Sequence, residues 1–182
     1  IMSMQQLIEK FSLDHCSKSG AKFDFEKGKW FNHKYLQELD NEQLAQLFKP
    51  VLEANGISGY SDQYITRVVS MVKDRINFVR DLWDQAQYFF VAPTQYEAKA
   101  VKKRWKEDTP QLLNSLIDHL NTLDDFSCAA AEASVIGWIT DNGYHMGNVM
   151  NAFRLTVVGD CKGPHMFDIT ELLGKDETIA RV

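Results

Sequence analysis

Side chains that could bind a metal or attack a substrate are few and scattered along the 182 residues. Cys161 lies four residues before His165, with His145 upstream, so these three residues are the candidates for a zinc site. A four-ligand set with the usual spacing is missing, and the remaining thiols, Cys16 and Cys128, form no C-x-x-C pair. We therefore expect no metal site, and an odd number of distant cysteines favours a reducing, cytoplasmic compartment.

Motifs that mark an enzyme active site are also missing from this sequence. No G-x-S-x-G turn, H-E-x-x-H pair or glycine-rich phosphate loop occurs, and no cysteine has a plausible base nearby in sequence. We therefore predict no catalytic residue in this chain.

Basic side chains cluster in one place, at Lys99, Lys102, Lys103, Arg104 and Lys106. They follow residues 94–97, whose Thr-x-x-Glu pattern is typical of a capping box and predicts the start of a helix. One interpretation is a solvated helix face, which we favour because such charge runs usually face water. The other is a patch that binds RNA phosphates.

The overall charge gives no hint of a nucleic-acid partner. The formal net charge is -5, and residues 121–182 hold 4 basic against 9 acidic side chains. A free-standing nucleic-acid binder is expected to be basic. Any RNA contact in this last third must therefore come from a few placed cations rather than from a basic field.

Helix signals recur along the whole chain, whereas strand-like alternation hardly occurs. Candidate N-caps stand at Asp24, Asn41, Ser61 or Asp62, Thr94 and Ser127. Asn55-Gly56 and Asn142-Gly143 are typical helix ends, and Val157-Val158 alone is too short for a sheet. We expect an all-α fold of helical bundles with no substantial sheet.

Two helical subdomains are predicted. Apolar periodicity is lost around residues 121–126, where the acidic pair Asp124-Asp125 lies. We therefore divide the chain into a junction segment at 1–23, a first helical subdomain at 24–123 and a second at 124–182. No apolar run reaches the roughly 18 residues that span a bilayer, so we expect a soluble protein without a membrane partner.

Three stretches near the end, residues 151–159, 163–167 and 171–178, resemble the carboxyl-terminal end of bacterial glutamyl-tRNA synthetases. Residues 18–24, with the aromatic and polar residues that follow them up to Tyr35, are similar to the place where the catalytic portion of that family meets its helical anticodon-binding portion. The resemblance covers nearly all of residues 5–182. Its middle, from residue 44 to 123, matches mainly in helical layout.

The resemblance implies the anticodon-binding part of a glutamate-tRNA ligase, a monomer that binds glutamate tRNA and no DNA. In that family an amino-terminal domain activates glutamate with ATP and magnesium, through H-I-G-H-type and lysine-loop signatures. This chain has neither, and we interpret the lysine-loop-like Ser17-Lys18-Ser19 as coincidence. We expect no cofactor in this chain and no aminoacylation by it alone, because the catalytic domain is absent from it.

Candidate anticodon contacts also follow from the resemblance. Arg154 matches the arginine that family members direct at the anticodon loop, and Pro164 and Met166 match loop positions that contact its bases. His145 lies where the family often has a basic residue. Arg67 is the candidate for the discriminating arginine, because glutamate and glutamine anticodons differ at the third base and a planar donor fork can select between C and G.

Aromatic and apolar candidates have a structural alternative. Trp30 is a possible platform for a base, but it recurs at helical spacing with Phe31 and Tyr35, so we favour a core position. Met166 and Phe167 can likewise belong to the core.

The two arginines have structural alternatives as well. Arg154 can pair with Asp168 or Glu171, and Arg67 with Asp62. The functional alternative for the whole chain is a free-standing helical module that binds a protein partner, which the net acidity favours. The two end motifs, in the expected order, outweigh it.

Overall fold

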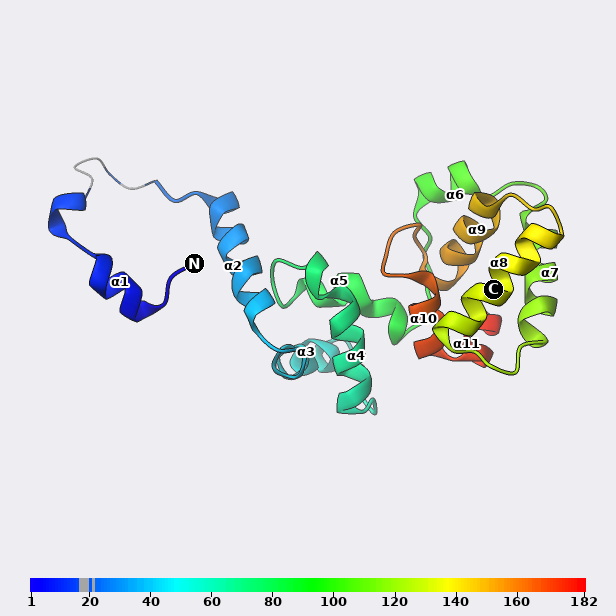
Figure 1. The fold of residues 1–182 in the computed structure, drawn as a ribbon, viewed down its shortest axis with the longest axis horizontal. Coiled ribbons are helices and arrows are strands. Elements are labelled where there is room, and N and C mark those ends of the chain that lie inside the picture. The colour runs from blue at the N-terminus through cyan, green and yellow to red at the C-terminus, as the bar shows by residue number, and fades with distance from the viewer. Residues whose placement is uncertain (17–19, 21) are drawn as a thin grey trace.

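A computed structural model describes residues 1–16, 20 and 22–182, which are drawn as a ribbon in Figure 1. The described residues form eleven α-helices and three short 3-10 helices, and no strand occurs among them. The predicted all-α fold is therefore confirmed. Val157-Val158 form the end of helix α9.

The first group of helices packs around the pair α3 and α4. It comprises α2 (Phe25–Glu38), α3 (Asn41–Ala54), α4 (Asp62–Val72), η2 (Lys73–Arg75), α5 (Asp81–Ala86) and η3 (Gln87–Phe89). Side-chain caps set the starts of α3 and α4: Asp40 accepts a hydrogen bond from Gln43 N at 2.6 Å, and Ser61 accepts one from Tyr64 N at 3.2 Å. Ser61 is thus an N-cap as predicted, whereas Asn41 is the first residue of its helix. The two helices bury a shared apolar stripe formed by Leu44, Phe48, Leu52, Ile65, Val68, Val69 and Val72.

The second group surrounds α9. It comprises α6 (Ala98–Arg104), α7 (Thr109–Asn121), α8 (Cys128–Asp141), α9 (Met146–Val158), α10 (Met166–Leu173) and α11 (Lys175–Arg181). Glu97 caps α6 by accepting hydrogen bonds from the backbone of Lys99 and Ala100, so the predicted capping box at Thr94 is wrong. The backbone N–H of Glu97 donates to Gly159 O at 2.9 Å. This tertiary bond holds the backbone at residue 97, so the helix begins at Ala98 rather than just after Thr94.

The division predicted after residue 123 falls inside the second group. Helix α7 packs against α8, α9 and α11, all of which lie beyond that position. Leu123 and Phe126 are partly buried against the core, so the loss of periodicity there marks a packed loop rather than a break in the core. Residues 90–97 connect the first group to the second.

Several contacts join the two groups. Helix η3 touches α10, and Arg67 of α4 forms an ion pair with Glu171 of α10. Arg181, whose side chain is only 5% exposed, donates to Tyr88 O at 2.6 Å and to Val157 O at 3.2 Å. The last helix is therefore bonded to both groups.

The amino-terminal segment lies apart from the other helices in Figure 1. Helix α1 (Met4–Lys10) has no buried residue, and η1 (Leu13–His15) follows it. Ser17-Lys18-Ser19 lie outside the described residues, as does part of the junction motif at 18–24. No helix in the described part of the chain is both long and apolar enough to cross a bilayer.

Candidate nucleic-acid interface

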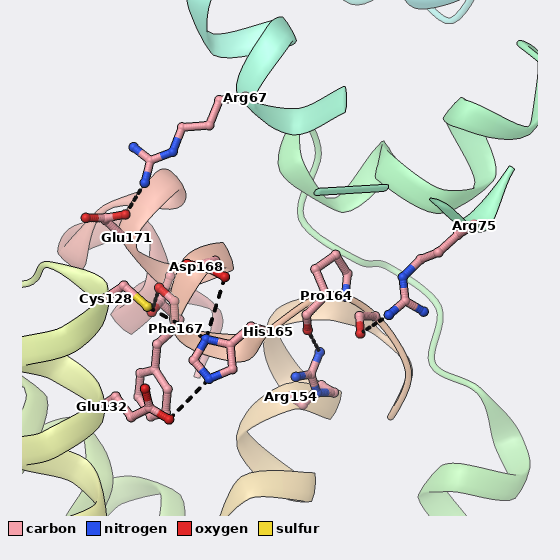
Figure 2. Close-up of polar contacts among 12 residues, drawn as sticks. Arg67, Arg75, Cys128, Glu132, Arg154, Pro164, His165, Phe167, Asp168 and Glu171 are labelled. Atoms are coloured by element: carbon pink, nitrogen blue, oxygen red, sulfur yellow. Dashed lines mark hydrogen bonds and ion pairs between the residues drawn. The ribbon is translucent and has the colours of Figure 1, made fainter. Parts of the chain in front are cut away.

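The loop of residues 159–165 joins α9 to α10, and two arginines hold its backbone (Figure 2). Arg154, near the end of α9, donates from Nη1 to Pro164 O at 2.8 Å. Arg75, at the end of η2, donates from Nη2 to Gly163 O at 2.8 Å. Because one arginine belongs to each helix group, the loop is fixed between them.

Two glycines allow this loop to approach its neighbours closely. Gly163 has a φ of 149°, and a Cβ atom there would lie 3.1 Å from Nη1 of Arg154 and 3.7 Å from the hydroxyl of Tyr88. Gly159 ends α9 with a φ of 86°, and a Cβ atom there would lie 2.9 Å from Gln95 O. A side chain at either position would strain the backbone, and at Gly159 it would also require a shift of the neighbouring chain.

Two guanidinium groups and a tyrosine hydroxyl lie next to the loop and have hydrogen-bond donors that are not used by any described residue. Burial lowers the pKa of the Arg154 guanidinium, and the nearby charge of Arg75 adds to that effect, yet an arginine stays charged at neutral pH. Burial also raises the pKa of Tyr88, whose buried hydroxyl has no hydrogen-bond partner among the described residues. Neither arginine forms an ion pair within the described part of the chain. Each guanidinium has five donors, so donors remain for a phosphate or a base edge.

A cleft of about 770 Å³ opens beside the loop. Both helix groups contribute to its walls, which include Arg75, Trp83, Tyr88, Pro93, Gln95 and Lys162. This volume lies within the roughly 300 to 1,000 Å³ typical of small-ligand pockets. The cleft is therefore of a size that suits a small ligand or a single nucleobase.

Arg67 lies on α4 and faces α10 rather than its own helix start. Its guanidinium forms an ion pair with Glu171, while Asp62, the partner suggested from the sequence, is bonded to Lys49 at 2.7 Å. Hydrogen bonds from Lys49 and Gln46 lower the pKa of Asp62. The Arg67 side chain is 47% exposed, so the pair lies open to solvent at the junction of the two groups.

Met166 and Pro164 differ in accessibility although they lie two residues apart. Met166 begins α10 and is 1% exposed, with Phe167 beside it in the core. The side chain of Met166 therefore belongs to the core, as the structural alternative expected. Pro164 is half-buried, and its carbonyl is the acceptor for Arg154.

The structure does not bring His145 and Trp30 to the loop. His145 is the exposed N-cap of α9, and the loop begins at the other end of this helix, roughly 20 Å away for 13 residues. Trp30 lies on α2, which Figure 1 shows apart from α9 and α10. Trp30 is 49% exposed, so the favoured core position is wrong. Its ring contacts Phe31 edge-on, and the Lys34 ammonium lies 5.8 Å from its centroid.

The alternative partners suggested for Arg154 are engaged elsewhere. Asp168 lies 3.6 Å from the His165 ring, and Glu171 pairs with Arg67. Arg154 is thus bound to the loop backbone rather than to a carboxylate.

Arg75 and Tyr88 were missed in the sequence. Neither belongs to a motif, and they lie 13 residues apart in two separate 3-10 helices. Their common position behind the loop arises only from tertiary packing. The lysines of the basic cluster are exposed, which fits both interpretations, a solvated helix face and a patch that binds RNA phosphates.

Comparison with known proteins assigns the fold to a family. A family model described as the anticodon binding domain matches residues 41–182. The chain belongs to this anticodon-binding family.

The relatives of this chain are glutamate-tRNA ligases, as the resemblance indicated. It is 56% identical over all of its 182 residues to the ligase of Phocaeicola vulgatus and 52% identical to that of Porphyromonas gingivalis. It spans 36% of the length of each. A solved glutamate tRNA ligase from Elizabethkingia meningosepticum superimposes with a TM-score of 0.90 at 38% identity, over the whole of this chain and 36% of that one.

Proposed function

We propose that this chain binds the anticodon loop of glutamate tRNA as part of a glutamate-tRNA ligase. Its membership of the anticodon-binding family and its full-length similarity to these ligases support the proposal. The observation that carries it is the arginine-held loop: Arg154 and Arg75 hold the backbone of Pro164 and Gly163. Arg75, Lys162 and Gly163 line the cleft beside it.

The geometry suggests how bases are held. Single-stranded bases are recognised when they are splayed out, stacked on planar groups and hydrogen-bonded along their edges. Arg154 and Arg75 offer fixed guanidinium planes with spare donors, and Pro164 offers a rigid apolar ring. The contact with RNA depends on these few groups, because the chain as a whole is acidic and offers no general attraction for phosphates.

A titration with two RNAs tests this proposal. Glutamate tRNA and the same tRNA with a swapped anticodon are titrated into the chain at two salt concentrations, and fluorescence anisotropy reports binding. We expect tighter binding to the cognate tRNA at both concentrations, with weaker binding to both RNAs at the higher one. Equal affinity for the two RNAs would contradict anticodon recognition.

The activity of the whole ligase is a further part of the proposal. ATP, magnesium and glutamate act in a catalytic part outside this chain, and the anticodon-binding part positions the tRNA. We also propose that the protein acts as a monomer in the cytoplasm.

A second candidate function is protein binding, and one observation favours it. Large apolar side chains are exposed along the amino-terminal segment, at Met4, Leu7, Ile8, Phe11, Leu13, Phe23 and Phe25. Exposed apolar side chains in this number along one segment favour a contact surface. In a ligase both functions are compatible, because the catalytic part can cover this surface while the opposite end binds RNA.

Binding to a separately produced catalytic part tests the second candidate. We expect the two pieces to elute together in size-exclusion chromatography, and Leu7→Asp combined with Phe11→Asp to separate them. Leu47→Asp, at an exposed apolar position on α3, is the matched control and should leave the complex intact.

A further inference from the structure

A second cluster of polar side chains lies immediately beyond the arginine-held loop. Cys128 is the first residue of α8, His165 is the N-cap of α10, and Asp168 lies in the first turn of α10. The Sγ atom of Cys128 is 3.7 Å from Nδ1 of His165, which is 3.6 Å from Oδ2 of Asp168. One ligand atom of each residue lies within 4.8 Å of the others. Figure 2 shows the three side chains converging from the two helices.

These separations match those of ligands around a tetrahedral zinc ion. With Zn–S near 2.3 Å and Zn–N and Zn–O near 2.1 Å, tetrahedral angles place S and N about 3.6 Å apart and N and O about 3.4 Å apart. We propose that Cys128, His165 and Asp168 bind a divalent metal ion, with Zn²⁺ as the ion that this donor set favours. Thiolate and imidazole ligands together select zinc over magnesium or calcium.

Glu132 supplies the partner that a metal-binding histidine requires. Its Oε1 lies 3.2 Å from Nε2 of His165, on the side of the ring away from Cys128 and Asp168. A proton held on Nε2 by this carboxylate leaves the lone pair of Nδ1 directed at the metal. Metal-binding histidines commonly donate their other ring nitrogen to a carboxylate in this way.

Charge and access also suit a cation. Asp168 and Glu132 have no lysine or arginine partner among the ion pairs of the described residues. His165 is exposed, so an ion and a fourth ligand, water, can reach the site from solvent. The proposal departs from the expectation of no metal, and it uses Cys128, which is distant from His165 in sequence, in place of Cys161.

Such an ion would fix the loop of residues 159–165 at its carboxyl-terminal end. Arg154 and Arg75 hold residues 163 and 164, and His165 follows directly. A metal bound to His165 joins the start of α8 to the start of α10. The carboxyl-terminal end of the RNA-facing loop would then be anchored beside the arginine bonds.

Cobalt serves as the probe, because a thiolate-bound Co²⁺ absorbs in the near ultraviolet and a tetrahedral Co²⁺ absorbs in the visible. The parent variant carries Cys16→Ser and Cys161→Ser, so that Cys128 is its sole thiol. We expect one equivalent of Co²⁺ to bind, Zn²⁺ to displace it and Mg²⁺ to leave it in place. Zn²⁺ should also raise the Tm of the parent variant.

Further substitutions identify the ligands. Cys128→Ala or Asp168→Asn should weaken binding by more than about 100-fold, and Glu132→Gln by roughly 10- to 100-fold. Asp141→Asn, at an exposed carboxylate at the far end of α8, is the control and should leave the affinity unchanged. Circular dichroism first establishes that each variant is folded, and Asp168→Asn replaces Cys128→Ala if the latter is not. The absence of stoichiometric cobalt binding in the parent variant would overturn the proposal, as would an unchanged affinity in a folded ligand variant.

Discussion

Arg154 combines a bond that holds the loop with donors that can face RNA, and substitution can separate the two roles. Arg154→Ala should weaken binding to glutamate tRNA by about 1 to 3 kcal/mol, the range for losing a stacked or hydrogen-bonded contact to a base. It should also lower thermal stability, because Pro164 O loses its donor. Arg154→Lys retains the charge and can keep one hydrogen bond, so it should preserve stability better than affinity.

Binding isotherms and melting curves of both variants check this prediction. Lys162→Ala, at an exposed cation on the wall of the cleft, is the comparison: loss of a phosphate contact weakens all RNAs about equally and lowers the salt slope by roughly one. If Arg154→Ala loses stability and retains full RNA affinity, its role is structural alone.

Substitution of Arg67 tests how the ligase chooses between tRNAs rather than how tightly it binds them. Arg67→Gln in the whole ligase should narrow the preference for glutamate over glutamine tRNA, because a residue that contacts one base edge changes the ratio of affinities. Glu171→Gln is the matched control, since it removes the same ion pair while keeping the guanidinium. Glu171→Gln should preserve or increase the preference for glutamate tRNA over glutamine tRNA. An equal effect of the two substitutions on the ratio would assign Arg67 to the ion pair alone.

Residues of the candidate site could be predicted from the sequence only where they belong to a local motif. Arg154 and Pro164 lie in the end motifs, and the structure bonds them to each other. Met166 belongs to the same motif, but its side chain is buried in the core, and burial depends on packing between helices, which no local pattern specifies. Arg75 and Tyr88 join the site through packing between separate helices, so spacing along the chain carried no signal for them.

At the scale of elements, the loop of residues 159–165 depends on one backbone conformation. Gly163→Ala should destabilise the fold by roughly 1 to 3 kcal/mol, because a φ of 149° is accessible almost solely to glycine and the added Cβ would press on Arg154. It should also weaken tRNA binding, since both arginine bonds end on this segment. Denaturant unfolding and tRNA titration measure the two effects.

Gly137→Ala provides the matched control for Gly163→Ala. Gly137 lies inside α8, and a Cβ atom there would meet nothing within 4 Å. This substitution should stabilise the helix by about 0.5 to 1 kcal/mol and leave RNA binding unchanged. Equal stability changes at the two positions would refute the role assigned to Gly163.

The helices themselves were largely predictable, because caps and apolar spacing act locally. Ser61 is the N-cap of α4, and Asn142-Gly143 follow the end of α8, as expected. Glu97 replaces Thr94 as a cap because a bond to Gly159 fixes the chain there. Where a tertiary contact competes with a local signal, the sequence alone points to the wrong residue.

At the scale of the whole molecule, the proposed function assigns tRNA binding to this chain and the chemistry to a catalytic part outside it. The chain alone should not charge tRNA with glutamate in the presence of ATP and magnesium, since no nucleotide-binding motif occurs in it. Addition of the catalytic part of a related ligase should create that activity. A filter assay with labelled glutamate measures both, and glutamylation by a clean preparation of this chain would refute the assignment.

The arginine bonds to the loop end on main-chain oxygens, at Gly163 and Pro164. A carbonyl is present whatever side chain its residue carries, so the path of this segment is largely independent of the side chain at the neighbouring position 162. Lys162 can therefore be exchanged to change how strongly RNA phosphates are held while the segment keeps its course. Such a scaffold lets the affinity for RNA change by single substitutions, without a simultaneous repair of the backbone beneath them.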